Sequence, residues 1–423
     1  MGPLGAAGRI LVLNAGSSSL KFKLFSLAPF AAGVGGMVDR IGDAARSCLT
    51  AKAPPGAGGA PGTKWGEAAP IRDHVEAMEA IMAFLTAHVS PSIAREVAAV
   101  GHRVVHGLDI HAAALLTDEV VAKVKLAATL APLHNPPGLQ GIAAAQKVFR
   151  GVPQVGVFDT AFHQTMPPAA YMYGVPWEWY EQHKIRRYGF HGTSHKYLAA
   201  TAAGMLGRPL EQLNAITCHL GNGSSVTAVK GGLSVDTSMG LTPLEGLVMG
   251  TRCGDLDPAI PLHMMATTGA SAADMAATLN KRAGLAGLCG DNDLRAIIDR
   301  QAGGDARAGL ALDVFVYRVR KYIGSYAAAL GGRLDALVFS AGIGENSALI
   351  RRLITDDLQG LGIEVDPAAN EATVGGAQGD ISGPGARTRV LVVPTDEELS
   401  IAQQTLEVLS AARAGAGAAP AAA

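Results

Sequence analysis

Two glycine- and serine-rich turns, each between apolar segments, carry the most evident binding chemistry in this sequence. The first follows Ile10–Leu13 as Gly16-Ser-Ser, and the second follows Ile216–Leu220 as Gly223-Ser-Ser. Tight turns of this kind present successive backbone N–H groups and hydroxyls to an anion, and glycine leaves no Cβ in the way. Two such hairpins facing each other could therefore bind a polyphosphate.

The same turns indicate an internal repeat. Each belongs to a strand, turn, strand plan, and Gly16 aligns with Gly223, 207 positions later in a chain of 423 residues. The pattern indicates a duplicated domain, although a chance similarity of two turns would look the same.

Other phosphate-binding devices can be tested against the sequence. No lysine directly follows a glycine, which excludes a Walker loop. No Gly-x-Gly-x-x-Gly follows a predicted strand, which argues against a dinucleotide-binding dehydrogenase. A third glycine cluster, Gly342–Asn346, lies between the apolar segment Leu334–Phe339 and a helical pattern from Ser347. A glycine turn between strand and helix is a common ligand position in α/β sheets, and it could equally be a helix cap.

The elements that must position these turns alternate between short strands and helices. Apolar, β-rich segments predict strands at Ile10–Leu13, Val152–Phe158, Ala215–Leu220 and Leu334–Phe339. Periodic segments predict helices near Val75–His88 and Gln140–Phe149. This alternation predicts an α/β fold with substantially parallel sheets.

Size and composition predict two compact domains. The chain has 423 residues, 48% of them hydrophobic and 17% charged, which is a globular balance and more than one core usually serves. With 35 Lys and Arg against 36 Asp and Glu, the net charge of −1 argues against nucleic acid or an anionic membrane as a partner. The 53 glycines fit either structureless segments or loops that approach a ligand.

The compartment can be inferred from the cysteines and from the apolar segments. The cysteines are widely spaced, at Cys48, Cys218, Cys253 and Cys289. We therefore expect no disulfide framework and no zinc site, and reduced thiols suit a cytoplasmic protein. Apolar stretches are too short for a signal peptide or a membrane helix. Gly, Ala and Pro dominate 1–8, 53–62 and 411–423, where we expect frayed ends and an inert surface loop.

Eight motifs, in order along the chain, resemble those of the acetate kinases. They are Asn14–Phe22, Gly101–Gly107, Val157–His163, Gly189–His195, His219–Ser225, Gly250–Pro258, Gly342–Asn346 and Pro394–Glu398. The resemblance covers about Arg9 to Val408. The ordered set makes it specific, since any one of these motifs alone is weak.

The resemblance implies a fold and an assembly. Acetate kinases are similar to the actin, hexokinase and glycerol kinase superfamily, which implies duplicated actin-like (ribonuclease H-like) ATPase domains with the active site in the interdomain cleft. We therefore expect an N-terminal domain of residues 1–160 plus 395–423, closed by the C-terminal helix, and a C-terminal nucleotide-binding domain of residues 161–394. The family also implies a homodimer.

The family's reaction is the reversible, Mg-dependent transfer of the γ-phosphoryl group of ATP to acetate, which gives acetyl phosphate and ADP. Bringing two anions together requires positioning and positive charge more than a strong base. By resemblance, Arg103 binds the substrate carboxylate, Arg252 stabilises the transferring phosphoryl group, and His191 donates a hydrogen bond to it. The family assigns Asp159 as the active-site acid. Because an ionised carboxylate needs no general base, we favour Asp159 as an orienter of Arg252, metal or water, and we expect His195 to be structural.

The resemblance also implies contacts to metal and polyphosphate. Asn14 and Glu397 would hold Mg²⁺, with Mn²⁺ as a possible substitute, while the adjacent Glu398 points elsewhere. Lys23 shares a strand face with Lys21, so spacing alone does not choose between them, whereas the motif favours Lys21. The expected polyphosphate contacts in the first turn are Ser17, Ser19 and Lys21.

By resemblance, ATP contacts three segments in the second half of the chain. The residues are His219, Leu220, Gly221, Asn222, Gly223, Asp293, Leu294, Arg295, Gly342, Ile343, Gly344, Glu345 and Asn346. The Asp-Leu-Arg tripeptide is the least specific of these, because an Asp before an amphipathic helix is an ordinary N-cap.

A small apolar pocket must hold the acyl methyl group. The resemblance implicates Val105, Leu133, Phe190 and Pro243, each of which could equally belong to an ordinary core. One methylene is worth only about 1–3 kcal/mol, so a propionate kinase remains the alternative, although β-branched Val105 favours acetate. His134 is expected beside the same cleft. Cys253 stands where the family often has Ser, as a redox-sensitive thiol beside Arg252 or as a small filler.

Two rival functions use the same hairpins. A sugar or polyol kinase would need an Asp base for a hydroxyl, and it would not need a pair of arginines. An actin-like or chaperone-type nucleotide switch would not explain Arg103, His191 and a small apolar pocket together.

Overall fold

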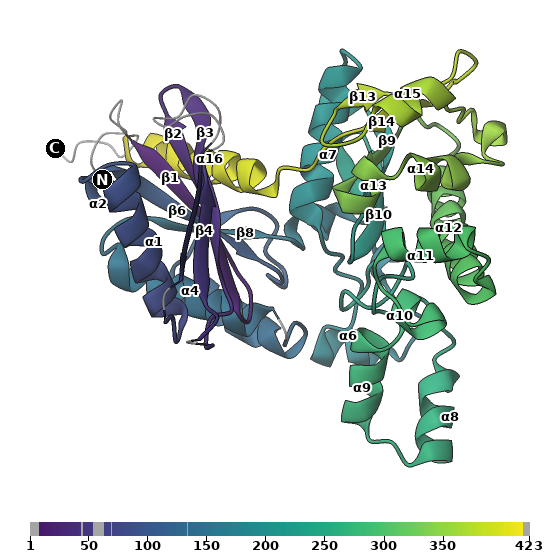
Figure 1. Ribbon diagram of the computed structural model, residues 1–423, viewed down its shortest axis with the longest axis horizontal. Coiled ribbons are helices and arrows are strands. Elements are labelled where there is room, and N and C mark those ends of the chain that lie inside the picture. The colour runs from purple at the N-terminus through teal and green to yellow at the C-terminus, as the bar shows by residue number, and fades with distance from the viewer. Residues whose placement is uncertain (1–7, 44, 54–62, 69, 133, 418–423) are drawn as a thin grey trace. The chain divides into compact units, whose positions relative to one another are not determined.

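The computed structural model describes residues 8–43, 45–53, 63–68, 70–132 and 134–417. The chain divides into two compact units, each built on its own mixed sheet (Figure 1). Unit 1 comprises Met1–Ala161 and Asp396–Ala423, and unit 2 comprises Phe162–Thr395. The α/β class is therefore confirmed. The expected surface loop at 54–62 and the expected frayed segments 1–7 and 418–423 lie outside the described residues.

Unit 1 contains an eight-stranded sheet in the order β5-β4-β3-β2-β1-β6-β8-β7. The strands are β1 (Arg9–Ala15), β2 (Ser19–Leu27), β3 (Phe30–Asp39), β4 (Cys48–Lys52), β5 (Lys64–Ala68), β6 (Val97–Val104), β7 (Ala114–Leu115) and β8 (Gln154–Phe158). β6 runs parallel to both β1 and β8, and the other neighbouring strands are antiparallel.

Different helices cover the two faces of this sheet. Successive residues of a strand point to opposite faces, so Leu11 and Leu13 pack with α1 (His74–His88) and α4 (Asn135–Val148). Ile10 and Val12 pack instead with α16 (Glu397–Gly417). The other helices are α2 (Ile93–Glu96), α3 (Asp118–Leu126) and the 3-10 helices Ala127–Thr129 and, across the unit boundary, Ala161–Thr165.

Unit 2 contains a six-stranded sheet in the order β11-β10-β9-β12-β14-β13. The strands are β9 (Asn214–Leu220), β10 (Ser224–Lys230), β11 (Leu233–Thr237), β12 (Ala336–Ser340), β13 (Gly379–Asp380) and β14 (Arg389–Val392). β12 runs parallel to both β9 and β14, and the remaining pairs are antiparallel.

The faces of the second sheet are also distinct. Ile216, Cys218 and Leu220 of β9 pack into the core that contains α12 (Ala306–Ala329). Ala215 packs with α7 (Gly192–Met205), so Thr217 and the residue two positions on also face α7. The other helices are α5 (Pro168–Tyr171), α6 (Trp177–His183), α8 (Ala259–Thr268), α9 (Ala272–Lys281), α10 (Gly284–Cys289), α11 (Leu294–Ala302), α13 (Ala341–Asn346), α14 (Ala348–Thr355), α15 (Pro367–Ala372) and the 3-10 helices Leu210–Gln212 and Gln359–Leu361.

The two sheets share a five-stranded core. The order β3-β2-β1-β6-β8 in unit 1 matches β11-β10-β9-β12-β14 in unit 2, and in both the first two pairings are antiparallel and the next two parallel. Five strands in the same order and directions confirm the internal repeat.

The alignment of the two turns differs from the sequence prediction. The last ladder pair before the first turn is Ala15 with Leu20, and the last before the second turn is Leu220 with Ser224. Gly16 therefore corresponds in position to Gly221, 205 residues later, and the alignment with Gly223 was wrong. The second turn is one residue shorter, so the Gly-Ser-Ser letters fall at different places in the two hairpins.

The predicted strands and helices are all present as β1, β8, β9, β12, α1 and α4. The prediction of substantially parallel sheets was wrong beyond the central three strands of each unit. Short connections add antiparallel neighbours to those strands, since only a long crossover can join parallel ones.

Two local predictions were also wrong. Gly342–Asn346 lies within α13, because the chain turns at Ala341, a non-glycine residue with a φ of 62°, and becomes helical at once. The C-terminal segment is helical as far as Gly417 in α16, although its composition predicted fraying from residue 411.

Candidate functional site

In unit 1, Arg103 and Asp159 form an ion pair at the carboxyl ends of two parallel strands. Arg103 lies on β6, and Asp159 directly follows β8. Nε of Arg103 donates to both carboxylate oxygens at 3.2 Å, and Nη2 donates to Oδ2 at 2.7 Å. The Asp159 side chain is only 1% exposed. One edge of the guanidinium is thus held in place, while Nη1 lies 3.6 Å from Oε2 of Glu397.

The charges around Arg103 keep it protonated. Burial alone would lower its pKa, but the attraction of Asp159 and Glu397, with a smaller contribution from Glu398, raises it above the usual value. Both adjacent glutamates therefore act on the arginine electrostatically. We expected Asp159 to orient Arg252, metal or water, whereas the ion-pair partner that the structure gives it is Arg103.

Gly101 explains how α16 comes close to Arg103. A Cβ on Gly101 would lie 2.4 Å from Oγ1 of Thr405 and 3.0 Å from Cγ2 of Ile401, both on α16. Only glycine lets the helix approach β6 this closely. Arg103 is two residues further along the strand and shares that face, which brings it to Glu397 at the start of the helix.

The structure gives different surroundings to Lys21 and Lys23 of the first hairpin, which their spacing alone could not distinguish. Lys23 Nζ donates to both carboxylate oxygens of Asp396, at 3.0 and 2.9 Å. Lys21 is exposed and lies opposite Asn14 in the β1–β2 ladder. The turn itself is held at Gly16, whose carbonyl is 2.8 Å from Nε2 of the buried His74. Ser17 is exposed and Ser19 is half-buried beside this turn.

Asn14 and Glu397 are the oxygen donors expected to hold magnesium. Asn14 continues the face of β1 that carries Ile10 and Val12, which is the face that α16 covers. Among the residues that the structure describes, no group of three or more His, Cys, Asp or Glu side chains is arranged to hold a metal. Two protein oxygens suit a magnesium ion that also binds phosphates and waters, and they do not suit a closed protein cage.

In unit 2, His191 adopts a strained backbone conformation at the start of α7. Its φ of 57° is in the left-handed region, which costs a residue other than glycine about 1–3 kcal/mol and is typical of functional sites. Its Nδ1 lies 2.9 Å from Oγ of Ser225, and its ring stacks on His219 with centroids 4.3 Å apart. His219 is in turn 2.8 Å from Oγ of Ser194, through Nδ1.

Arg252 converges with His191 beside the second hairpin. A Cβ on Gly223 would lie 3.5 Å from Nη1 of Arg252 and 3.7 Å from Nε2 of His191. Nη1 donates to the Pro243 carbonyl at 3.1 Å, and burial lowers the pKa of this arginine. No carboxylate forms a salt bridge with Arg252 in the described part of the chain. Its charge is therefore available to an anionic ligand.

Two glycines hold the loop that carries Arg252. Gly250 donates its N–H to the Asn222 carbonyl at 3.1 Å, and a Cβ there would lie 1.9 Å from Oδ1 of the same asparagine. Gly284, with a φ of 62°, begins α10, and a Cβ there would lie 2.2 Å from the Met249 carbonyl oxygen. Gly284 falls outside all of the motifs, so the sequence offered no signal that it supports Arg252.

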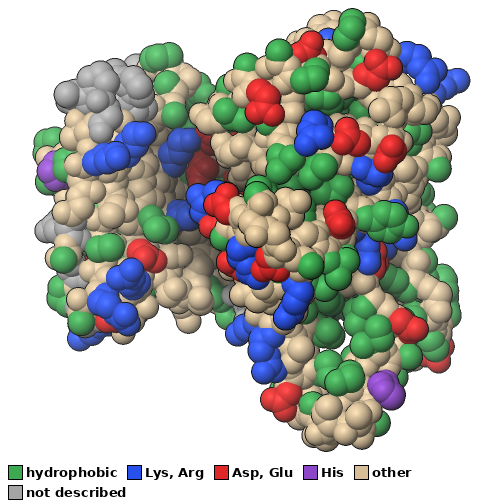
Figure 2. Space-filling view, turned by 45° about the vertical axis from the view of Figure 1, so that its right-hand side comes forward, with side chains coloured by type: hydrophobic (Ala, Val, Ile, Leu, Met, Phe, Trp, Pro, Cys, Tyr) green, Lys and Arg blue, Asp and Glu red, His purple; other side chains and the backbone are tan. Residues whose placement is uncertain are grey.

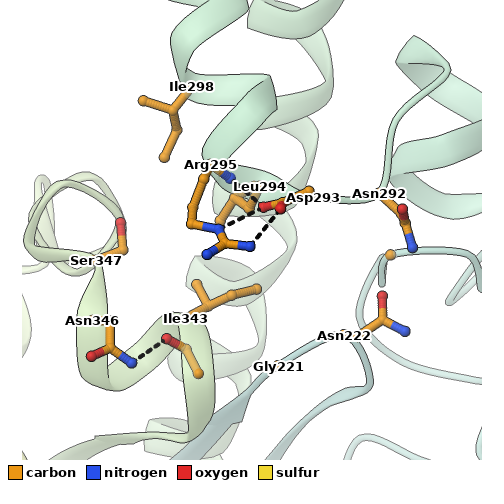
Figure 3. Close-up of a pocket in the computed structure, with 12 residues that line it drawn as sticks. Gly221, Asn222, Asn292, Asp293, Leu294, Arg295, Ile298, Ile343, Asn346 and Ser347 are labelled. Atoms are coloured by element: carbon orange, nitrogen blue, oxygen red, sulfur yellow. Dashed lines mark hydrogen bonds and ion pairs between the residues drawn. The ribbon is translucent and has the colours of Figure 1, made fainter. Parts of the chain in front are cut away.

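A cavity of about 640 Å³ opens in unit 2 near the second hairpin. Figure 3 shows Ile298 and Arg295 of α11 on one side and Ile343 and Asn346 of α13 on the other. Its lining is Gly221, Asn222, Gly250, Asn292, Asp293, Leu294, Arg295, Ile298, Gly342, Ile343, Asn346 and Ser347. The volume and the mixture of aliphatic and amide groups suit a nucleoside.

Asp293 and Arg295 show that an ordinary helix cap can also line a pocket. Asp293 caps α11 by accepting from the Arg295 N–H at 3.0 Å. The Arg295 guanidinium folds back onto the same carboxylate, at 3.0 and 2.6 Å, and this hydrogen bonding lowers the pKa of Asp293 (Figure 3). The side chain of Arg295 is 90% exposed, so it is free to turn toward a ligand.

Of the thirteen residues expected at ATP in the second half of the chain, five do not line this cavity. Leu220 is fully buried in the core, and Gly344 packs against Phe339. Glu345 accepts from the Thr395 N–H at 3.0 Å. His219 and Gly223 lie instead beside His191. The cavity residues missing from the expected set are Gly250, Asn292, Ile298 and Ser347, and each is inside or within three residues of a predicted segment.

A buried arginine, Arg351, supports α13. Arg351 is 0% exposed, and its Nη1 donates to the carbonyls of Gly344 and Glu345 at 2.9 and 3.0 Å. Nη2 donates to the carbonyls of Asn370 and Thr373, and Nε donates to Oδ1 of Asn370 at 2.7 Å. Burial lowers its pKa to about 10. Arg351 thereby binds the C-terminal carbonyls of a helix that lines the cavity.

The residues expected around the acyl methyl lie in both units. Val105 is half-buried after β6, while Phe190 is 1% exposed and Pro243 is half-buried in unit 2. Leu133 lies outside the described residues. His134 is half-buried and precedes α4 as its N-cap residue.

The remaining histidine and cysteine expectations concern His195 and Cys253. His195 is 0% exposed, with its two ring nitrogens bonded to Thr217 and Ser225. Cys253 is half-buried, its Sγ donates to the Gly254 carbonyl at 3.1 Å, and burial raises its pKa. A protonated thiol of this kind suits a small filler better than a redox-sensitive group. All four cysteines are free.

The surface carries charges of both signs. Figure 2 shows Lys and Arg interspersed with Asp and Glu over the drawn face of unit 2, without an extended basic patch. Within the described residues, every helix is too short or too polar to cross a membrane.

The chain was then compared with known proteins. Residues 9–403 match the sequence profile of the Acetokinase family. The chain is 48% identical to the acetate kinase of Syntrophobacter fumaroxidans over 422 residues, which cover 97% of this chain and 99% of that protein. The crystal structure of Porphyromonas gingivalis acetate kinase superposes with a TM-score of 0.88 at 42% identity, over 95% of this chain and all of that one. A propionate kinase from Francisella tularensis follows, with a TM-score of 0.86 at 41% identity over 94% of this chain and 98% of that one.

Proposed function

The chain belongs to the Acetokinase family, and we propose that it transfers the γ-phosphoryl group of ATP reversibly to acetate, giving acetyl phosphate and ADP. The observation that carries this proposal is the bidentate pairing of Asp159 with Arg103. A hydroxyl acceptor would need a free carboxylate base, whereas Asp159 is occupied by a guanidinium. An acceptor that is already an anion needs the arginine and no base.

Acetate would bind at the Nη1 edge of Arg103, which lies 3.6 Å from Oε2 of Glu397. Asp159 holds the Nε and Nη2 edge, which leaves Nη1 and the outer face of Nη2 for the substrate carboxylate. Val105, Leu133, Phe190 and Pro243 are the residues that we assign to the acyl methyl group. Asp159 would act by holding the arginine in place and keeping it charged, and it would not accept a proton from acetate.

The transferring phosphoryl group would meet Arg252 and His191. Both approach the space beside Gly223, where an added Cβ would be within 3.7 Å of each. A guanidinium and an imidazole N–H placed there would stabilise the charge on the equatorial phosphoryl oxygens during in-line transfer. The absence of a carboxylate on Arg252 among the described residues supports this role, because its charge is not already neutralised.

The nucleotide would occupy the cavity lined by α11, α13 and the second hairpin. Ser17, Ser19 and Lys21 of the first hairpin would contact the polyphosphate. Magnesium fits Asn14 and Glu397, whose amide and carboxylate oxygens are the ligands that it prefers. When bound, Mg²⁺ would supply positive charge that offsets the charge of the phosphates, and Mn²⁺ has compatible chemistry.

The second candidate is a propionate kinase. The similarity to a solved propionate kinase at 41% identity favours it, and one methylene is worth only about 1–3 kcal/mol in a pocket. The half-buried, β-branched Val105 beside Arg103 supports the smaller acid. We further propose a homodimer in the cytoplasm, which the free thiols and the exposed Trp177 and Trp179 of α6 support.

A hydroxylamine trap tests the proposal directly. Purified protein with ATP, magnesium and acetate is expected to give acyl hydroxamate, and the ranking of kcat/KM for acetate, propionate and butyrate identifies the acid. Arg103→Leu should abolish the product, while Arg208→Leu, which removes another Arg–Asp pair in unit 2, should not. Failure to form hydroxamate with any of the three acids would refute the proposed function.

A further inference from the structure

A row of four hydrogen-bonded side chains runs through the face of unit 2 that α7 covers. Oγ1 of Thr217 lies 2.7 Å from Nδ1 of His195, and Nε2 of His195 lies 2.7 Å from Oγ of Ser225. The same Oγ lies 2.9 Å from Nδ1 of His191. Thr217, His195 and Ser225 are each 0% exposed, so water does not compete for these groups.

The hydroxyl proton of Thr217 determines which group donates and which accepts in each hydrogen bond of this row. A hydroxyl carries one proton to donate, and His195 Nδ1 is the partner that the described part of the chain offers to Oγ1 of Thr217. The opposite direction would leave that buried proton without an acceptor. Thr217 therefore donates to Nδ1 of His195, and the proton of a neutral His195 ring lies on Nε2.

His195 is held in its neutral form. Burial, together with the nearby His163 and His219, lowers its pKa well below the usual value. A neutral ring has one N–H, which donates from Nε2 to Oγ of Ser225. Ser225 then has one proton left to donate, and Nδ1 of His191 is the acceptor within reach.

We propose that Ser225 is a positioning residue that holds His191 as the tautomer with its proton on Nε2. That nitrogen lies 3.7 Å from the position of a Cβ on Gly223, and Nη1 of Arg252 lies 3.5 Å from the same point. An N–H donor thus lies beside the place assigned above to the transferring phosphoryl group. This inference rests on the proposed function for what the donor does, although the tautomer itself does not.

The row also explains a pattern that the motifs alone do not. Ser225 is the last residue of its motif, and His195 is the last residue of another, yet neither is expected to touch a substrate. Ser225 and His219 are cross-strand partners on β10 and β9, on the sheet face toward α7. The two motif ends meet because they form the support of His191, and His219 completes that support by stacking on its ring.

Nitrogen NMR of histidine-labelled protein tests the tautomer without any activity measurement. A long-range ¹H–¹⁵N spectrum distinguishes a protonated imidazole nitrogen from a bare one, and comparison with His191→Gln assigns the signals. We expect Nε2 of His191 to be protonated and Nδ1 bare in the wild type near neutral pH. Ser225→Ala should give a mixture of the two tautomers. A wild-type His191 protonated on Nδ1 alone would overturn the proposal.

Kinetics test the consequence for catalysis. Ser225→Ala should lower kcat about tenfold with little change in KM, the ratio expected for one lost hydrogen bond. The matched control is Ser234→Ala, which removes an equally buried hydroxyl that lies 2.9 Å from Nδ1 of His163. It should leave kcat within about twofold. Thr217→Val should have an intermediate effect, because it removes only the donor that sets the direction of the row.

These outcomes separate the inference from the proposed function. If the wild type forms acetyl phosphate and Ser225→Ala has the same kcat and the same tautomer as the wild type, the inference is wrong and the function stands. If the wild type has no activity with any acid, the proposed function fails, and the spectra still decide the tautomer. Equal losses in Ser225→Ala and Ser234→Ala would reduce the effect to general stability and contradict the positioning role.

Discussion

The two units share one five-stranded core, yet the chemistry at their hairpins is opposite in kind. In unit 1 the sheet face toward α16 carries charged groups in ion pairs, Arg103 with Asp159 and Lys23 with Asp396. In unit 2 the face toward α7 carries His, Ser and Thr side chains joined by hydrogen bonds. A duplicated fold therefore repeats the backbone frame without repeating what the frame holds.

The difference follows from burial and from the partners available. In unit 1 opposite charges compensate the partly buried Arg103 and Lys23, and two of them are Glu397 and Asp396, at and just before the start of α16. His195, which is fully buried, stays neutral instead, and the hydroxyls of Thr217 and Ser225 bond its two ring nitrogens.

The largest expected effect comes from breaking the ion pair of unit 1. Asp159→Asn removes the charge that holds and compensates Arg103, so kcat/KM for acetate should fall about 100-fold or more in the coupled assay. Loss of one partner from a buried pair should also cost about 3 kcal/mol in urea unfolding. Normal kcat/KM in this variant would mean that Arg103 needs no carboxylate, and the contrast between the units would lose its basis.

The next effect compares the two hairpins. Gly223→Ala places a methyl at ordinary contact distance, 3.5 Å from Arg252 and 3.7 Å from His191, so the fold should persist. The methyl would occupy the space assigned to the phosphoryl group, and kcat should fall about 100-fold. Gly16→Ala meets Oγ of Ser19 at 2.9 Å, a group that can rotate, and the Ser19 carbonyl oxygen at an ordinary 3.7 Å, so less than a tenfold change is expected. Equal losses would show that the hairpins do equivalent work.

The third effect concerns support of the nucleotide cavity. Arg351→Met would leave four buried carbonyls and an Asn370 side chain unsatisfied, which should cost about 3 kcal/mol or more and raise KM for ATP. Its neighbour Arg352, half exposed and 3.6 Å from Asp356, is the matched control, and Arg352→Met should cost about 0.5 kcal/mol or less. Thermal unfolding and ATP titration measure both. A normal KM for ATP in a folded Arg351→Met protein would contradict the supporting role.

The smallest effects separate the lysines of the first hairpin. Lys23→Met breaks a half-buried ion pair and should cost about 1 kcal/mol of stability with little change in KM for ATP. Lys21→Met should leave stability unchanged and raise KM for ATP about tenfold, because this exposed lysine is the one free to meet phosphate. The reverse pattern would assign the polyphosphate to Lys23.

The elements were predictable because they depend on local patterns. Strands β1, β8, β9 and β12 are short apolar segments, and α1 begins at Asp73, whose carboxylate caps the helix. The alternation of strands and helices did not show the extent of parallel pairing, because hairpins such as β1–β2 and β9–β10 add antiparallel neighbours without a crossover. The helix α13 was missed because its glycines weaken the helical pattern, whereas in the structure Arg351 of the next helix, α14, donates to its carbonyls and stabilises it.

The candidate site divides in the same way. By itself the sequence indicated which side chains could carry the chemistry, because arginine, histidine and carboxylate are the groups whose charge and hydrogen-bonding capacity suit anionic ligands. Only the tertiary structure decided their partners: Asp159 with Arg103, Lys23 with Asp396, and Ser225 between two histidines. These choices depend on which helix covers which sheet face, and on glycines such as Gly101 that permit the approach, because a side chain's partner is set by packing between segments far apart in the chain.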